Sequence, residues 1–324
     1  MCIRDRLLAC SDLPLLETLK GSFSSKFDMT DCGEAKVCLG LEIRRDREHK
    51  RLHLSQAKYT AKVLERFNMS DCKPVVTPMM AQFTPADLEG EAADKHLYQQ
   101  VIGSAMYLSV GSRPDISFTV SRLAQHVQSP TVTMWTAAKR LLRYIAGTRL
   151  LGIVYDGAQD LQPKGFSDSD WGGCKIQRKS TSGYAFIMAG GAISCKAKKQ
   201  GCVAQSSAEA EYMALAAAAS EAIWLSNIYT FTTSSTCSKL VKILADNQGA
   251  IKMAKNDSSG TRTKHIDIKY HFVRDSHAKN LFTLDYCPTT DMAADILTKP
   301  LERTLLKKHC KSLGLARDIH NRTE

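Results

Sequence analysis

Apolar and polar residues alternate in short runs along the second half of the chain. Strand-like runs cover residues 152–155, 163–167, 184–188, 192–195, 240–245 and 281–286, and helix-like stretches cover 206–230, 264–279 and 290–297. The run Ala189-Gly190-Gly191 is typical of a hairpin turn. Strands that first pair antiparallel and then alternate with helices predict an α/β fold with a mixed sheet covered by helices.

The first half of the chain has a different pattern. Residues 37–43 and 51–55 are expected to pair as a hairpin across a polar turn, and a helix is expected over 56–68. Prolines 74, 78 and 85 then favour an extended linker. These patterns predict a first segment over 1–93, a helical region over 94–150, an α/β domain over 151–312 and a tail over 313–324.

One acidic residue of the predicted helix 206–230 has an unusual position. Ser206 and Glu209 have the spacing of a capping box, which gives Glu209 a structural role at the first turn. Glu211 instead heads the apolar stripe that continues through Leu215 and Ala218. A carboxylate on that side is costly to bury unless it is paired, protonated or bound to a metal. The alternative is that Glu211 lies at the edge of the stripe and reaches solvent.

Three further acids lie where strands or helices end. Asp246 ends an apolar strand, where it is a candidate ligand or an ordinary helix N-cap. Asp168 and Asp170 share one face of a strand, so alternation does not choose between them. Asp295, taken alone, also fits a surface acid. Carboxylates that a fold brings together need a cation between them, and such hard oxygen ligands suit Mg²⁺.

Charge and cysteine content narrow the class of protein. A net charge of +11 favours a polyanionic partner. The basic clusters Lys139, Arg140, Arg143 and Lys196, Lys198, Lys199 are either nucleic-acid contacts or solvated faces. The 11 cysteines include no C-x-x-C pair, which favours reduced thiols over a zinc site. No apolar run is long enough for a membrane span, and the apolar core of the first ten residues is too short for a signal peptide, so a cytoplasmic or nuclear location is expected.

Six strings of the second half resemble the ribonuclease H domain of the copia-type LTR retrotransposon Pol polyprotein. They are S-D-S-D-W (167–171), R-K-S-T-S-G-Y (178–184), S-S-A-E-A-E-Y (206–212), D-N-Q (246–248), T-K-H-I-D-I-K-Y-H-F (263–272) and A-D-I-L-T-K-P-L (294–301). Each string is modest alone, but their common order makes the resemblance specific.

The first half resembles the C-terminal part of the reverse transcriptase that precedes this domain. The strings are F-D-M-T-D-C-G-E-A, L-G-L-E-I, L-S-Q-A-K-Y, M-S-D-C-K-P-V-V-T-P-M, G-S-A-M-Y-L and R-P-D-I-S-F-T-V. The family's polymerase turn Tyr-x-Asp-Asp would fall at Cys2-Ile3-Arg4-Asp5, where Arg4 replaces the first Asp. Polymerase activity is therefore not expected, and this part is expected to be an α+β remnant of the palm, thumb and connection.

The resemblance implies a ribonuclease H-like mixed five-stranded sheet and an RNA/DNA hybrid endoribonuclease. It selects Asp168 over Asp170 and makes Asp168, Glu211, Asp246 and Asp295 the catalytic metal ligands. It implies two Mg²⁺ ions, which Mn²⁺ can replace, an RNA/DNA hybrid as partner, and a virus-like particle as the location in an intact element. Lys264 and His265 are expected at the nucleic acid as well. The competing interpretation is an inactive element remnant that only binds nucleic acid.

Overall fold

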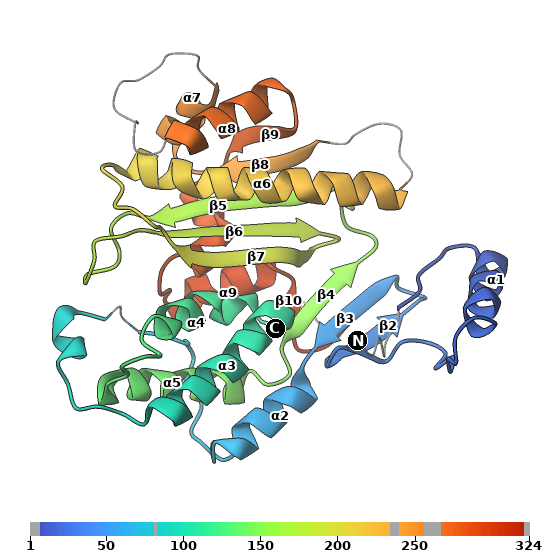
Figure 1. Ribbon diagram of the computed structural model, residues 1–324, viewed down its shortest axis with the longest axis horizontal. Coiled ribbons are helices and arrows are strands. Elements are labelled where there is room, and N and C mark those ends of the chain that lie inside the picture. The colour runs from blue at the N-terminus through green and yellow to red at the C-terminus, as the bar shows by residue number, and fades with distance from the viewer. Residues whose placement is uncertain (1–6, 81–82, 234–239, 256–266, 321–324) are drawn as a thin grey trace.

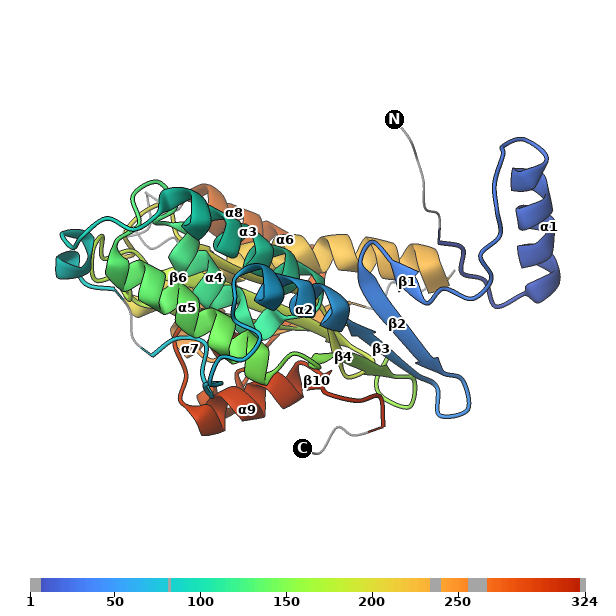
Figure 2. The ribbon, with the colours of Figure 1, turned by 90° about the horizontal axis from the view of Figure 1, so that it is seen from below.

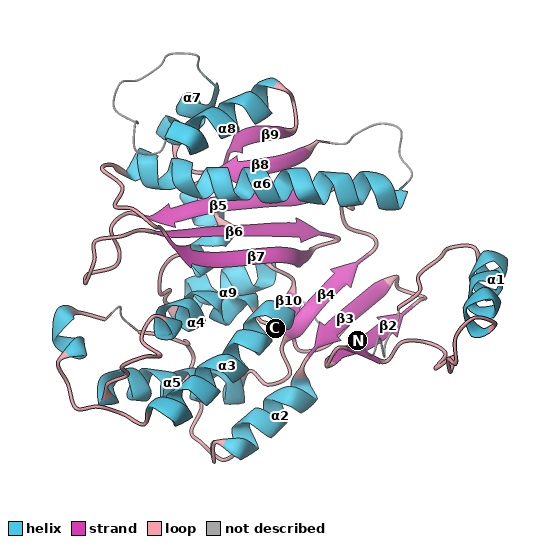
Figure 3. Ribbon diagram, in the orientation of Figure 1, coloured by secondary structure: helices cyan, strands magenta, loops and turns pink. Residues whose placement is uncertain are grey.

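Two five-stranded sheets organise the protein in a computed structural model that describes residues 7–80, 83–233, 240–255 and 267–320 (Figures 1 and 3). The second sheet has the order β7-β6-β5-β8-β9. Its strands are β5 (Lys164–Asp170), β6 (Thr181–Met188), β7 (Gly191–Lys199), β8 (Val241–Ala245) and β9 (Phe282–Tyr286). The first three pair antiparallel, whereas β8 is parallel to both β5 and β9. This arrangement confirms the predicted five-stranded mixed sheet.

Side chains of this sheet divide between two cores because neighbouring residues in a strand point to opposite faces. In β6, Tyr184 and Phe186 belong to one core, and Ala185 belongs to the other. In β8, Ile243 and Leu244 are divided in the same way. The sheet is therefore buried on both faces, which explains why β8 is a nearly continuous apolar run.

Three helices cover one face of the sheet: α6 (Ser207–Thr233), α7 (Gln248–Lys255) and α8 (Asp267–Ala278). The long helix α6 runs along β5 and packs against β5 and β8 (Figure 1), and alanines 218, 219 and 222 are fully buried in the core that they share. Small side chains let a helix approach a sheet closely, so this alanine stripe fixes the depth at which the first turns of α6 lie. That depth places Glu211 at the sheet.

The opposite face packs against the preceding helical region. It consists of α3 (Lys95–Gly111), the 3₁₀ turn η2 (Pro114–Ile116), α4 (Ser117–Ala124) and α5 (Val132–Gly147), which confirms the helices expected there. The same core includes η5 (Ala293–Leu297) and α9 (Arg303–Ser312). The predicted helix over 290–297 is wrong in type, because η4 (Thr289–Asp291) and η5 are two short 3₁₀ turns.

The first sheet combines strands from the first third of the chain with strands that follow residue 150. Its order is β1 (Val37–Cys38), β2 (Leu41–Asp46), β3 (Arg51–Ser55), β4 (Gly152–Asp156) and β10 (Leu315–Ala316), all antiparallel. The strand expected over 37–43 is split, because Leu39 and Gly40 both adopt positive φ angles, of 47° and 75°. The predicted hairpin with 51–55 is otherwise present as β2 and β3.

Strand β4 differs from its predicted place. It was expected to open the α/β domain, yet it pairs with β3 of the first sheet, and β10 closes that sheet from beyond α9. Gly314 makes this return possible. Its φ angle is +75°, and a Cβ there would lie 2.5 Å from the Gly190 carbonyl oxygen, so only glycine fits. The domain limits at 150 and 312 stay predictions, since hydrogen bonds of the first sheet cross both.

Two helices of the first segment contrast in packing. Helix α2 (Ala57–Arg66), predicted over 56–68, buries Val63 and Leu64. Helix α1 (Leu13–Ser24) buries none of its residues and stands away from the body of the protein (Figure 2). No helix among the described residues combines the length and apolarity needed to cross a membrane.

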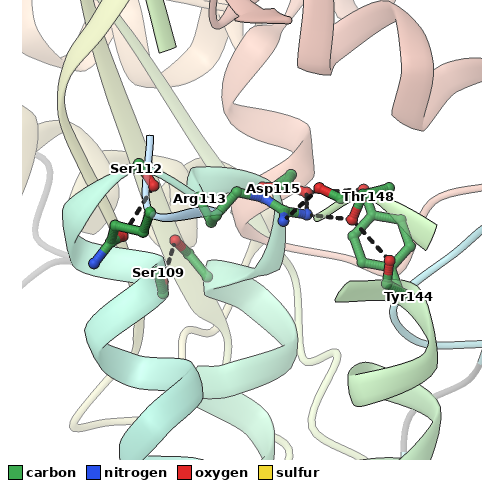
Figure 4. A network of polar contacts seen from close by, with 8 residues as sticks. Ser109, Ser112, Arg113, Asp115, Tyr144 and Thr148 are labelled. Carbon is green, nitrogen blue, oxygen red and sulfur yellow. Dashed lines mark hydrogen bonds and ion pairs between the residues drawn. The ribbon is translucent and has the colours of Figure 1, made fainter. Parts of the chain in front are cut away.

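A buried ion pair holds the helical region together (Figure 4). Arg113 donates to both carboxylate oxygens of Asp115, at 2.9 and 2.7 Å, and to the carbonyl and hydroxyl of Thr148. The hydroxyl of Tyr144 donates to Asp115 at 2.8 Å. The side chains of Arg113 and Asp115 are 1% and 0% exposed. Because the pair is this well satisfied, the cost of its burial is offset only while both partners are present.

We expect Asp115→Ala to lower the free energy of unfolding by about 3–5 kcal/mol, since it leaves the Arg113 guanidinium buried without a counter-charge. Tyr144→Phe removes one hydrogen bond from the same carboxylate and should cost only about 1 kcal/mol. Urea denaturation followed by circular dichroism measures both. Equal losses in the two variants would show that the ion pair is not what stabilises this region.

Candidate active site

Asp168 lies on β5, the central strand of the second sheet. Its side chain is buried, and its Oδ2 accepts a hydrogen bond from the Thr298 hydroxyl. Asp170, two residues on, accepts instead from the backbone N–H of Thr181 on the neighbouring strand. Alternation along the strand did not separate the two acids. The structure places Asp168 beside the other acids and gives Asp170 a role in strand pairing.

Glu211 projects from the second turn of α6. The start of this helix is fixed by Glu209, whose N–H donates to the Ser206 hydroxyl at 3.2 Å, while its carboxylate accepts from the Gln205 N–H at 2.7 Å. One of the two hydrogen bonds of the expected capping box is thus present. The Glu209 carboxylate accepts from the N–H of Gln205, whereas a capping box requires a bond from that of Ser206. Glu211 is 8% exposed and does not reach into open solvent.

Asp246 follows β8, at the carboxyl end of a strand parallel to β5. Its Oδ2 accepts from the Thr289 hydroxyl at 2.8 Å. The alternative of an N-cap does not apply, because the side chain of Asn247 caps α7 by accepting from the Ala250 N–H at 3.0 Å. Asp246 is therefore free of a helix-capping role and faces the neighbouring acids.

These three carboxylates converge. One oxygen from each of Asp168, Glu211 and Asp246 lies within 4.8 Å of the others. Mainly through burial, and then through the charge of Asp295, the pKa of Asp168 is raised to about 7. Burial also raises the pKa of Glu211 to about 9, with the charges of Asp168 and Asp246 adding to it. Raised carboxylate pKa values of this kind are typical of functional sites, including sites that bind a cation.

The donor set fits a divalent cation. All three groups are hard oxygen ligands, as Mg²⁺ and Mn²⁺ prefer. The Ser169 N–H donates to Glu211, but Glu211 Oε2 is buried and has no hydrogen-bond partner within the described part of the chain. A buried carboxylate oxygen without a donor is unfavourable unless a cation or a proton satisfies it.

Asp295, the fourth predicted ligand, is bound differently. It lies in η5, is 2% exposed, and raises the pKa of Asp168, so the two charges are close. Its Oδ1, however, pairs with Lys299 Nζ at 2.8 Å, and it is not one of the three converging ligands. Burial alone would lower the pKa of Lys299, yet the charges of Asp168 and Asp295 raise it, so the ammonium stays protonated.

Three residues at the site were not singled out from the sequence. Thr298 and Lys299 contact Asp168 and Asp295. Gln200, at the end of β7, donates to Ser169 and Ser182 at 3.2 and 2.9 Å and to the Ala210 carbonyl at 2.9 Å, which ties α6 to the sheet beside Glu211. The threonine and lysine lie in the string T-K-P-L next to Asp295, and that adjacency was the available signal.

The chain is similar to known proteins over almost its whole length. A family model described as reverse transcriptase (RNA-dependent DNA polymerase) matches residues 1–81. Over 319 residues the chain is 37% identical to the retrovirus-related Pol polyprotein from transposon TNT 1-94 of Nicotiana tabacum, covering 96% of this chain and 24% of that protein. The corresponding protein from transposon RE1 of Arabidopsis thaliana is 36% identical over 316 residues, covering 97% and 21%. The chain belongs to the copia-type Pol polyprotein family.

This copia-type Pol chain spans 24% and 21% of the length of these two curated relatives. It is also 36% identical over 224 residues to an uncharacterized mitochondrial protein of Arabidopsis thaliana, AtMg00810, covering 69% of this chain and 92% of that protein. Among solved structures, an RNase H1 isolated from compost is similar with a TM-score of 0.34 and 13% identity, covering 43% of this chain and 93% of that one.

The basic residues predicted at nucleic acid fall into three groups. In α5, Arg140 donates to the Thr77 hydroxyl at 2.8 Å and Arg143 to the Lys73 carbonyl at 2.7 Å, so both hold the linker; Lys139 lies over the Trp135 ring. On β7, Lys196 and Lys198 are exposed, and Lys199 donates to Gln125. Lys264 and His265 lie outside the described residues. Contact of any of these side chains with nucleic acid stays a prediction.

The raised pKa values predict how stability depends on pH without a divalent cation. An acid with a raised folded pKa binds protons more readily in the native state than in the unfolded chain. The contribution of Asp168 and Glu211 to stability therefore falls as pH rises from about 4 toward 7 and 9 respectively. Thermal unfolding of the full chain in EDTA should show this decrease.

We expect Glu211→Gln, which mimics the protonated acid, to melt about 3–10 °C higher than the parent in EDTA at pH 8. The matched control is Asp275→Asn, which removes one charge from an exposed ion pair with Lys279. That control should melt like the parent. A Glu211→Gln variant that melts at or below the parent would mean that this carboxylate is stabilised as an anion in the free protein.

Proposed function

We propose that this chain is a ribonuclease H, a metal-dependent hydrolase of the RNA strand in RNA/DNA hybrids. The observation that carries the proposal is the convergence of Asp168, Glu211 and Asp246 within 4.8 Å in a buried position. The cluster lies where the parallel strands β5 and β8 end, the edge at which α/β sheets bind ligands. The similarity of the chain to retrovirus-related Pol polyproteins also supports the proposal.

We further propose that Asp168, Glu211 and Asp246 hold Mg²⁺, with Mn²⁺ as a substitute. Bound at such a site, a divalent cation lowers the pKa of a water and offsets charge that develops on a phosphate. The chain's own part is to keep the carboxylates in place. The Thr298 hydroxyl orients Asp168, the Thr289 hydroxyl orients Asp246, and the Ser169 N–H orients Glu211. Asp295 adds negative charge beside Asp168 and is the proposed fourth acid.

Substrate binding would use the basic residues of β7, because Lys196 and Lys198 are exposed on a strand next to β6. These lysines would bind the phosphates of the DNA strand. Selectivity for RNA would come from contacts to 2′-hydroxyls near the acids. Arg140 and Arg143 are weaker candidates for substrate binding, because their guanidinium groups already bind the linker.

The competing proposal is a Pol remnant that binds nucleic acid without cleaving it. The feature that favours it is Arg4 in place of the first polymerase aspartate, which also leads us to expect no templated DNA synthesis. Cleavage of a hybrid separates the two proposals, because both include binding and only one includes hydrolysis.

We expect the full chain to cleave the RNA of a labelled hybrid with Mg²⁺ or Mn²⁺, and to leave single-stranded RNA and duplex DNA intact. Asp168→Asn should lower the rate by at least about 100-fold while hybrid affinity changes little, since loss of a metal ligand removes charge stabilisation of the transition state. Asp170→Asn is the matched control from the same strand. Comparable activity of Asp168→Asn and the parent would refute the catalytic assignment.

Hybrid binding should weaken as salt rises, because phosphate neutralisation releases counterions. Each phosphate contact contributes about −0.9 to the slope of log affinity against log salt on B-form DNA, and a similar order is expected for a hybrid. The double change Lys196→Gln and Lys198→Gln should make the slope shallower by about 1–2. Lys62→Gln, at an exposed position of α2, should leave it unchanged. Fluorescence anisotropy at several salt concentrations gives the slopes, and identical slopes in all variants would exclude this surface.

A further inference from the structure

The contact between Asp295 and Lys299 sets this site apart from a simple cluster of four acids. The side chain of Asp295 is 3% exposed, and Lys299 Nζ lies 2.8 Å from its Oδ1. Three carboxylates converge without Asp295, whereas the fourth already has a cation beside it. The positive charge that a second metal ion would bring to Asp295 is thus supplied by the chain.

The backbone around this lysine is held in place. The N–H groups of Thr298 and Lys299 both donate to the Asp295 carbonyl, at 3.2 and 3.3 Å, and Pro300 follows directly. Lys299 also lines a small cavity with Phe118 and Thr119 of α4. A lysine on such a fixed turn holds its ammonium near the acids, which a long side chain on a mobile loop would not do.

The ammonium also acts beyond its immediate partner. Its positive charge reaches Asp168, Glu211 and Asp246, so it reduces the repulsion among all the acids of the cluster. A divalent ion that used Asp295 would have to displace this ammonium or accept its repulsion.

We propose that Lys299 is a built-in counter-cation that takes the place of one of the two metal ions expected at the site. The proposal rests on the proposed function only in taking this cluster as the metal site. Asp168, Glu211 and Asp246 then bind one divalent ion readily, and the ion that uses Asp295 binds only after the ion pair to Lys299 is broken. Lys299 is in this sense a positioning residue that sets how many ions the free protein holds.

The test is Mn²⁺ binding to the full chain without nucleic acid, followed by the electron paramagnetic resonance signal of free Mn²⁺. The parent should bind one ion tightly and a second only weakly. Lys299→Gln should bind two, with the second at least about tenfold tighter than in the parent, since removing one nearby positive charge favours a cation. Lys299→Arg retains the charge and should behave like the parent.

Lys308→Gln is the matched control. It removes the same charge from an ion pair of the same length, 2.8 Å to Asp291, on the surface near η4. Its Mn²⁺ binding should equal that of the parent. A gain in Lys308→Gln as large as that in Lys299→Gln would reduce the effect to net charge and overturn the proposal.

Further results for Lys299→Gln would also overturn or support the proposal. Unchanged stoichiometry and affinities in Lys299→Gln would overturn the proposal, as would loss of the first ion, which would make the lysine a purely structural partner of Asp295. Retention of the first ion by Lys299→Gln demonstrates that the variant is folded. If Mn²⁺ binds as expected but the parent does not cleave hybrids, the proposed ribonuclease function fails and the assignment of Lys299 stands.

Discussion

Burial of like charges is the constraint on which the site depends. Asp168, Glu211 and Asp295 are each less than 9% exposed, and Asp246 is half-buried beside them. Carboxylates in such surroundings repel one another and lose hydration, so the fold must supply compensation. It does so with hydrogen bonds from hydroxyl and backbone donors, with the Lys299 ammonium, and with raised pKa values that favour protonation. Together these contacts do not satisfy every carboxylate oxygen, because Glu211 Oε2 has no hydrogen-bond partner in the described part of the chain. A divalent cation bound by the acids would supply the missing partner.

The position of the acids depends on segments far apart in the sequence. Asp168 and Asp246 come from adjacent parallel strands, but Glu211 requires the alanine face of α6, and Asp295 requires η5 to lie against the opposite face. That face is shared with the preceding helical region. Asp115 of the buried ion pair and Lys299 line the same small cavity, so the turn that bears Asp295 is supported by residues upstream of the second sheet. The helical region is therefore part of the structure that shapes the site, and β4 and β10 join the two parts again through the first sheet.

Sequence patterns correctly predicted those features that depend on residues close together in the chain. The apolar stripe of α6 indicated that Glu211 lies on the core-facing side of the helix, and the apolar run 240–245 indicated a strand, because each depends on residues close in sequence. The sequence pattern did not show to which sheet β4 belongs, since its five residues suit either sheet and only the register Arg51↔Asp156 to Ser55↔Gly152 decides. The two-residue strand β10 is too short to leave a pattern. The choice of Asp168 over Asp170 came from family resemblance, because both acids lie on the same side of β5 and only contacts with Thr181 and Thr298 distinguish them.

The basic surface shows why composition alone overestimates a binding site. Arg140 and Arg143 contribute to the net charge of +11, yet the guanidinium group of each donates a hydrogen bond to the linker, at Thr77 and Lys73 respectively. Lys299 contributes as well, and its charge is directed inward at the acids. Near the second sheet, Lys196 and Lys198 are exposed on the edge strand β7, where they alternate with partly buried residues. A charged edge strand resists pairing with other chains, so Lys196 and Lys198 would also disfavour pairing of β7 with a second chain.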